Sequence, residues 1–227
     1  MRVLMISLDR RLLHESDVVA RHQKYAELAG SLDVIVFGGE EAYTEWSKNF
    51  RVFTTGSTKV THYRKAKALT AKLIDQNKYD LMVAQDFASP VAKRIKEKFG
   101  IPFIVSIHSM FFHKQWLGLN PFKWCAFYRI KRALKAASGF RAVNGKIQDQ
   151  LRRWGLEQPV LVEPTPVDTE KFFVAEKKPN AVPIILFVGR LSAEKNVALL
   201  IRAFLELEEP EILKIVVDGP QRAWLQK

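Results

Sequence analysis

Short apolar segments alternate with amphipathic segments of helical period along most of this chain. The apolar segments have the length of strands and cover residues 3–8, 34–37, 81–84, 103–107, 140–143, 160–162, 184–188 and 213–217. The helical patterns include residues 17–29, 62–76, 90–98, 122–137 and 145–154. Such alternation is typical of a mostly parallel sheet with helices on both faces. The segment 40–59 is polar and has no clear period, so we assign it no element.

A cluster of prolines indicates a boundary between two parts of the chain. Charged residues stand between these prolines, which are Pro164, Pro166, Pro179 and Pro183. Proline ends regular structure, so residues 164–183 are predicted to be an interdomain linker. The sequence thus predicts an α/β protein: a complete, doubly wound, Rossmann-like domain over 1–163 and the first β-α-β part of a second over 184–227.

Composition excludes several classes of protein. With 227 residues and 48% hydrophobic content, the chain can bury a substantial core. The single cysteine, Cys125, rules out an intramolecular disulfide and a zinc finger, and it fits a reducing cytoplasm. No apolar stretch approaches the roughly 20 residues that a membrane-spanning helix needs.

The chain carries a net charge of +12 and has an isoelectric point near 9.8. Such a surface attracts nucleic acid, anionic lipid or phosphorylated small molecules. The aromatic and glycine pattern of an RNA-recognition sheet is missing, so nucleic acid is not an expected partner. An anionic membrane surface or a nucleotide substrate is expected instead.

Two cationic residues, Arg190 and Lys195, follow the apolar run 184–188 and precede a helical pattern that opens at Val197. The N-terminus of a helix favours negative charge, and both side chains can add charge-assisted hydrogen bonds to a phosphate. Gly189 would let the backbone turn tightly and approach the phosphate closely. The alternative is a solvated surface turn in which Glu194 and Lys195 simply begin a helix.

The phrase at residues 187–196 resembles the nucleotide-sugar site of the family-4 glycosyltransferases of the GT-B fold. The resemblance covers nearly the whole chain and rests also on residues 1–7, 79–86, 102–108, 164–172 and 213–220. It implies a retaining, metal-independent transfer from a nucleotide-diphospho sugar to a glycan or lipid-linked acceptor, with no cofactor. Fixed cations would stabilise the departing diphosphate in place of a metal, because the chain has no Asp-x-Asp pair.

By this resemblance Arg190 and Lys195 hold the diphosphate, Gly189 shapes the turn, and the catalytic-site residue His108 faces the reacting sugar. His108 follows the apolar run 103–107, at the strand end where open α/β sheets bind ligands. A structural role for this histidine is an equal alternative. The turn at residues 218–220 is read as structural, with a possible donor contact.

The chain is expected to be truncated within its donor-binding domain, because the family's Glu-x7-Glu pair is absent. The alternative function is therefore an inactive remnant, or a basic module that binds membranes or polyanions. The stretch 110–154 favours membrane contact, since it interleaves large aromatic residues with lysines and arginines. An ordinary amphipathic helix that packs its aromatic residues inward is the other interpretation. The expected location is cytoplasmic, with possible peripheral contact at the inner membrane face.

Overall fold

The computed structural model describes residues 1–58, 60–109, 117–167, 169, 181–192, 195–208, 211–216 and 218–225. The chain divides into two compact units, unit 1 (Met1–Pro166) and unit 2 (Val167–Lys227). The predicted domain limits of 1–163 and 184–227 remain a prediction, and residues 170–180 of the predicted linker lie outside the described part. Each unit is described by itself below.

Unit 1 is built on a single eight-stranded sheet with the order β3-β4-β2-β1-β5-β6-β7-β8. Only the β3–β4 pair is antiparallel. The strand order reverses between β1 and β5, which is where ligands bind at the carboxyl edge of open α/β sheets. The strands are β1 (Arg2–Ser7), β2 (Ser31–Val36), β3 (Tyr43–Ser47), β4 (Phe50–Thr54), β5 (Leu81–Gln85), β6 (Phe103–Ile107), β7 (Gly139–Ala142) and β8 (Val160–Val162).

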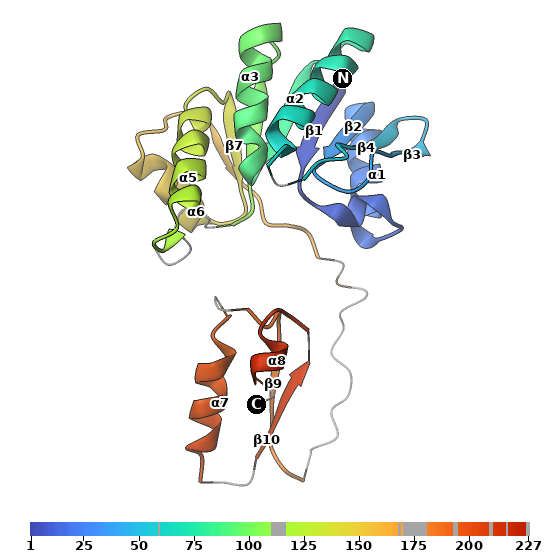
Figure 1. The fold of residues 1–227 in the computed structure, drawn as a ribbon. Coiled ribbons are helices and arrows are strands. Elements are labelled where there is room, and N and C mark those ends of the chain that lie inside the picture. The colour runs from blue at the N-terminus through green and yellow to red at the C-terminus, as the bar shows by residue number, and fades with distance from the viewer. Residues whose placement is uncertain are drawn as a thin grey trace. The chain divides into compact units, whose positions relative to one another are not determined.

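Helices cover the two faces of this sheet unequally. Because side chains alternate along a strand, Leu4 and Ile6 of β1 enter one core while Val3 and Met5 enter the other. The first core is packed by α2, α3, α5 and α6, of which α2, α3 and α5 are side by side in Figure 1. The second core is packed by α1. The helices are α1 (Asp17–Ala29), α2 (His62–Gln76), α3 (Ser89–Phe99), α5 (Pro121–Leu134) and α6 (Gly145–Arg153).

Local signals explain where several helices begin and end. The Ser16 side chain accepts a hydrogen bond from the Val19 amide at the start of α1, and Asn120 does the same for α5. Gly100 ends α3 with a φ of 75°, a conformation that glycine adopts without steric cost. Within the described residues, no helix is both long and apolar enough to cross a membrane.

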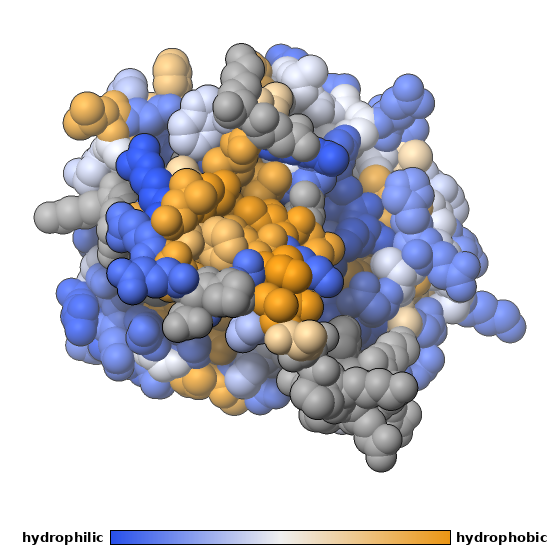
Figure 2. Space-filling model, turned by 90° about the horizontal axis from the view of Figure 1, so that it is seen from below, coloured by the Kyte–Doolittle hydropathy of each residue, from blue (hydrophilic) through white to orange (hydrophobic). Residues whose placement is uncertain are grey.

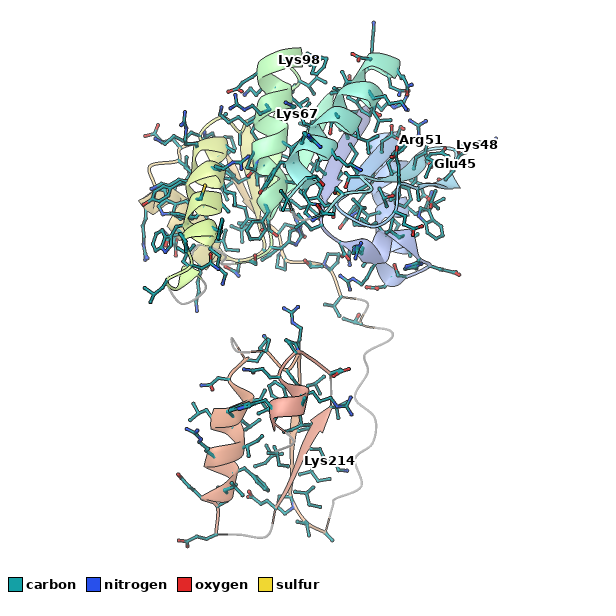
Figure 3. The ribbon with its side chains drawn as sticks, viewed as in Figure 1. Glu45, Lys48, Arg51, Lys67, Lys98 and Lys214 are labelled. Atoms are coloured by element: carbon teal, nitrogen blue, oxygen red, sulfur yellow. The ribbon has the colours of Figure 1, made fainter. Side chains whose placement is uncertain are left out.

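Asp33 of β2 lies in a buried ion network inside unit 1. Its side chain has 0% exposure and accepts bonds from Arg51 at 2.6 Å, from Arg2 at 3.1 Å and from the Tyr79 hydroxyl at 2.5 Å. Arg51, which is labelled in Figure 3, belongs to β4, the next strand of the sheet. Burial alone would raise the pKa of Asp33, but the bonds from Arg51 and Tyr79 outweigh it and lower that pKa.

Unit 2 contains β9 (Ile184–Val188), α7 (Val197–Leu205), β10 (Ile212–Val216) and α8 (Arg222–Leu225). The two strands pair in parallel. One face of this small sheet is open, since Leu186 and Val188 are 59% and 68% exposed and Val216, the register partner of Val188, is exposed as well. Figure 2 shows hydrophobic residues gathered in one large patch on the face of the molecule that it displays.

Candidate functional site

Four neighbouring strands of unit 1 bring polar side chains to the carboxyl edge of the sheet. Because β1, β5, β6 and β7 are parallel, their last residues and the turns that follow lie at the same edge. These residues are Ser7, Gln85, Asp86, Ser106, His108 and Arg141. The sequence predicted only His108 among them as a site residue.

His108 is placed directly after β6 and bonds to a side chain of β6 itself and to the turn after the neighbouring strand β5. Its Nε2 atom lies 2.9 Å from Ser106 Oγ, and its backbone N–H donates to Asp86 Oδ1 at 2.9 Å. Desolvation by the surrounding protein lowers the pKa of His108, and the positive charge of Arg141 lowers it further. A neutral imidazole at this edge can accept or donate a hydrogen bond to a sugar hydroxyl.

Asp86 is a candidate site residue that the sequence analysis did not single out. It begins the short helical turn Asp86–Ala88 after β5 and has a φ of 40°, which is uncommon for a residue other than glycine. Burial raises the pKa of Asp86 to about 6, although the backbone N–H groups of His108 and Ser109 oppose that shift. Strained backbone and a raised carboxyl pKa are features that cluster at functional sites.

Two cavities in unit 1 meet at this edge. The sheet-face cavity, of about 440 Å³, runs along the open sheet face from Val3 and Leu32 to His108. The carboxyl-edge cavity, of about 370 Å³, includes Asp9, Asp86 and His108. The two cavities share five of their lining residues, which are Arg21, His22, Gln85, His108 and Thr165. Such volumes are in the range of small-molecule sites.

The three predicted donor-binding residues lie in unit 2, in the loop between β9 and α7. Arg190 and Lys195 are exposed, and Gly189 directly follows β9. The φ of Gly189 lies outside the left-handed region, so its backbone could accommodate another residue there, and an added Cβ would lie 3.3 Å from the Phe187 ring. The turn conformation therefore does not require glycine at position 189, and its close approach to a phosphate stays a prediction.

A second turn supports this loop. The Leu191 N–H donates to the Asp218 carbonyl at 3.2 Å, and the Gln221 N–H donates to the Leu191 carbonyl at 3.1 Å. A Cβ on Gly219 would lie 2.5 Å from the Leu191 carbonyl oxygen, so only glycine fits there. The turn at 218–220 therefore has the structural role that the sequence suggested. Val217, Ala193 and Glu194 lie outside the described residues.

Unit 1 thus holds the predicted catalytic residue and unit 2 the predicted donor-binding residues, and their roles stay predictions. In the part of the chain that the structure describes, no group of three or more histidine, cysteine, aspartate or glutamate side chains is arranged to hold a metal ion.

Two protein-family models match consecutive parts of the chain. Residues 8–171 match "Glycosyltransferase Family 4", and residues 168–227 match "Glycosyl transferases group 1". A curated relative from Bacillus subtilis (strain 168), named as a teichuronic acid biosynthesis glycosyltransferase, TuaC, is 26% identical over 179 residues. That alignment covers 72% of this chain and 44% of the relative, so the chain spans less than half the length of this protein.

Solved structures share the fold. Sucrose-phosphate synthase from Thermosynechococcus elongatus superposes with a TM-score of 0.78 at 16% identity, over 97% of this chain and 63% of that one. The lipopolysaccharide outer core galactosyltransferase WaaB gives 0.68 at 18% identity, over 100% of this chain and 63% of that one. The E. coli trehalose-6-phosphate structure bound with UDP-2-fluoro glucose gives 0.69 at 13% identity, over 100% and 67%.

These structures have the GT-B fold, in which two Rossmann-like domains follow one another in the chain. The parallel sheet of unit 1 and the β-α-β arrangement of unit 2 agree with the fold that the sequence predicted. The first family model alone covers well over half of the residues. The chain therefore belongs to glycosyltransferase family 4 and has the GT-B fold.

Proposed function

We propose that this chain takes part in transfer of a sugar from a nucleotide-diphospho sugar to a glycan or lipid-linked acceptor, with retention of configuration and without a metal ion. Unit 2 binds the donor and unit 1 binds the acceptor. The observation that carries the proposal is the consecutive match of both units to glycosyltransferase families. Three solved relatives support a uridine nucleotide as one donor candidate, because they were determined with UDP, UDP-L-rhamnose or UDP-2-fluoro glucose.

The cationic loop after β9 supports the donor role of unit 2. Arg190 and Lys195 are exposed, so a diphosphate can approach both side chains from solvent. The start of α7 adds to the site, because Asn196 makes no side-chain cap there. Fixed positive charge placed where the leaving diphosphate gains charge lowers the barrier to transfer.

Binding of nucleotide sugars by calorimetry tests this role on the full chain. We expect saturable binding that Arg190→Ala and Lys195→Ala each weaken by roughly 10- to 100-fold, since each removes a charge-assisted hydrogen bond. Lys214→Ala is the matched control, because Lys214 is an exposed cation in the middle of β10 (Figure 3) and should leave binding unchanged. Absence of binding would favour the alternative, a basic module that binds membranes or polyanions without transferring sugar.

A lipid-linked acceptor would place the protein at the cytoplasmic face of a membrane, and the start of α5 supports that location. The structure separates the aromatic residues of this region: Phe127 and Trp154 pack against the core, whereas Phe122 and Tyr128 are 84% and 59% exposed. Leu119, just before the helix, is fully exposed. The exposed cations Arg129 and Arg132 follow about two and three turns after Phe122 along the helix. A helix that exposes both apolar side chains and cations fits an anionic lipid surface.

Flotation with phosphatidylglycerol-containing vesicles tests this contact. The double variant Leu119→Ser, Phe122→Ser should lower vesicle affinity at least roughly tenfold, because two apolar side chains lose their burial in lipid. The double variant Leu28→Ser, Val60→Ser removes equally exposed apolar residues elsewhere in unit 1 and should have no effect. Equal losses in both double variants would refute a specific docking surface.

A further inference from the structure

Arg21 and His22, neighbours on α1, line both cavities of unit 1. His22 is 4% exposed, and its Nε2 atom is buried without a hydrogen-bond partner among the described residues. Arg21 is half-buried, and the described part of the chain gives its guanidinium no hydrogen-bond or ion-pair partner. Native proteins rarely leave a buried polar atom such as His22 Nε2 unsatisfied, so this acceptor beside a cavity indicates a ligand, and Arg21 next to it supplies a positive charge.

The bonding of His22 determines what it can recognise. Its Nδ1 atom lies 2.7 Å from the Val18 carbonyl, which can only accept, so Nδ1 carries the proton. Burial lowers the pKa of His22, which keeps the ring neutral. The Nε2 atom is therefore a bare acceptor, and its partner must bring a donor such as a hydroxyl group.

Arg21 requires an anionic group of the ligand, in contrast to the hydroxyl donor that His22 requires. The other cation of the sheet-face cavity, Arg141, bonds only to the neutral Ser106 Oγ and Pro164 carbonyl, both at 3.2 Å. Asp9, in the carboxyl-edge cavity, is already paired with Arg11 at 2.8 Å. Two guanidinium groups thus lack an anionic partner among the described residues. Arg21 is also close enough to His108 for its charge to lower the pKa of that histidine.

We propose that Arg21 and His22 bind an acidic group and a neighbouring hydroxyl of the acceptor, so that the acceptor is an anionic saccharide. A carboxylate alone offers no hydroxyl donor to His22, inorganic phosphate offers only the P–O–H group of the same small ion, and a neutral sugar offers no charge to Arg21. A uronic acid and a sugar phosphate offer both. The inference depends on the proposed function, in which unit 1 binds the acceptor.

Binding of simple sugars, measured by NMR on the full chain without donor, tests the inference. The probes are methyl glucuronide, glucose 6-phosphate, the neutral methyl glucoside and inorganic phosphate. The two charged sugars should bind at least roughly tenfold more tightly than the glucoside, and the tighter of the two identifies the acidic group. Binding should also shift the Nε2 nitrogen resonance of His22, which a distant site would leave unchanged.

Arg21→Gln should weaken the charged sugars by roughly 10- to 100-fold and abolish the preference over the glucoside. The control Lys24→Gln removes the same charge from an exposed position on the same helix and should change affinity less than twofold. Equal binding of all three sugars, equal losses in both variants, or inorganic phosphate binding as tightly as the charged sugars would each overturn the inference. If charged sugars fail while nucleotide sugars still bind through Arg190, the inference fails and the proposed function stands.

Discussion

Asp33 on β2 and Asp86 in the turn after β5 both lie in unit 1, but their surroundings shift the carboxyl pKa in opposite directions. Asp33 accepts bonds from two arginines and a tyrosine, which together lower its pKa. Asp86 accepts only backbone N–H groups, pairs with no cation among the described residues, and has its pKa raised to about 6. Asp33 lines none of the cavities described above, whereas Asp86 lines the carboxyl-edge cavity.

The difference separates a structural acid from a candidate functional one. Removing the charge of a buried, paired carboxylate destabilises the fold, because its cationic partners are left without an anion. A carboxylate with a raised pKa and a strained backbone lowers the stability of the folded chain. Proteins keep such an unfavourable arrangement mainly at functional sites. The two aspartates should therefore change stability in opposite directions when their charge is removed.

The largest effect is expected for Asp33→Asn. Removing this charge leaves Arg2 and Arg51 without their anion, which should lower the free energy of unfolding by roughly 3 to 5 kcal/mol at pH 7. Because the folded pKa lies below the unfolded value, this contribution is present above about pH 4 and is lost as the pH falls further. Urea unfolding followed by circular dichroism measures both effects.

The matched control for this variant is Asp75→Asn, which removes a charge from an exposed position on α2. It should change stability by less than about 0.5 kcal/mol. If Asp33→Asn were equally mild, the ion network would contribute little, and the contrast between the two aspartates would disappear.

Asp86→Asn should have the opposite sign. The folded chain holds a proton on Asp86 between about pH 4 and pH 6 that the unfolded chain releases, so stability falls as the pH rises through this range. An uncharged asparagine avoids that cost and also tolerates the positive φ. We expect a gain of about 1 to 3 kcal/mol at pH 8 that vanishes below pH 4.

The same urea experiment at pH 4 and pH 8 decides the outcome for Asp86→Asn, with wild type measured alongside. If this variant lost stability at pH 8, as Asp33→Asn should, Asp86 would be a structural acid too. A stability gain combined with weaker binding of the charged sugars would support a role in the acceptor site.

Most elements could be predicted from the sequence, because their apolar periods match the structure. The predicted helices at 17–29 and 62–76 coincide with α1 and α2, and the predicted strands at 103–107, 160–162 and 184–188 coincide with β6, β8 and β9. The segment without an assignment contains β3 and β4. β3 is a half-exposed edge strand of mixed polarity, so it lacks the apolar run of a buried strand.

The candidate site was less predictable, since its geometry depends on contacts between distant residues. His108 could be found from its position after an apolar strand. The hydrogen bond from the His108 N–H to Asp86 joins residues that are 22 positions apart, and no local sequence pattern predicts it. The sequence analysis did not single out His22, and only the three-dimensional structure reveals its unpaired nitrogen.

Tyr79→Phe tests the Asp33 network more gently. It removes the hydroxyl that donates to Asp33 at 2.5 Å but leaves both arginines in place. We expect a loss of about 1.5 to 3 kcal/mol, the range for a hydrogen bond to a charged group. Tyr43→Phe, at an exposed position on β3, is the control and should have a smaller effect. A loss as large as that of Asp33→Asn would mean that the tyrosine, rather than the arginines, holds the carboxylate.

The smallest effect on stability is expected for Ser106→Ala. Ser106 lies at the carboxyl edge of the sheet, as does Asp86. Arg141 donates to Ser106 Oγ, which leaves the hydroxyl proton to donate to Nε2 of His108 and so stabilises the neutral imidazole. Without the hydroxyl, the pKa of His108 should rise toward its ordinary range, while the free energy of unfolding changes by less than about 1 kcal/mol. An NMR titration of His108 measures the first effect. A fall in that pKa would mean that His108 donates to the serine, and that the histidine meets its ligand with the other ring nitrogen unprotonated.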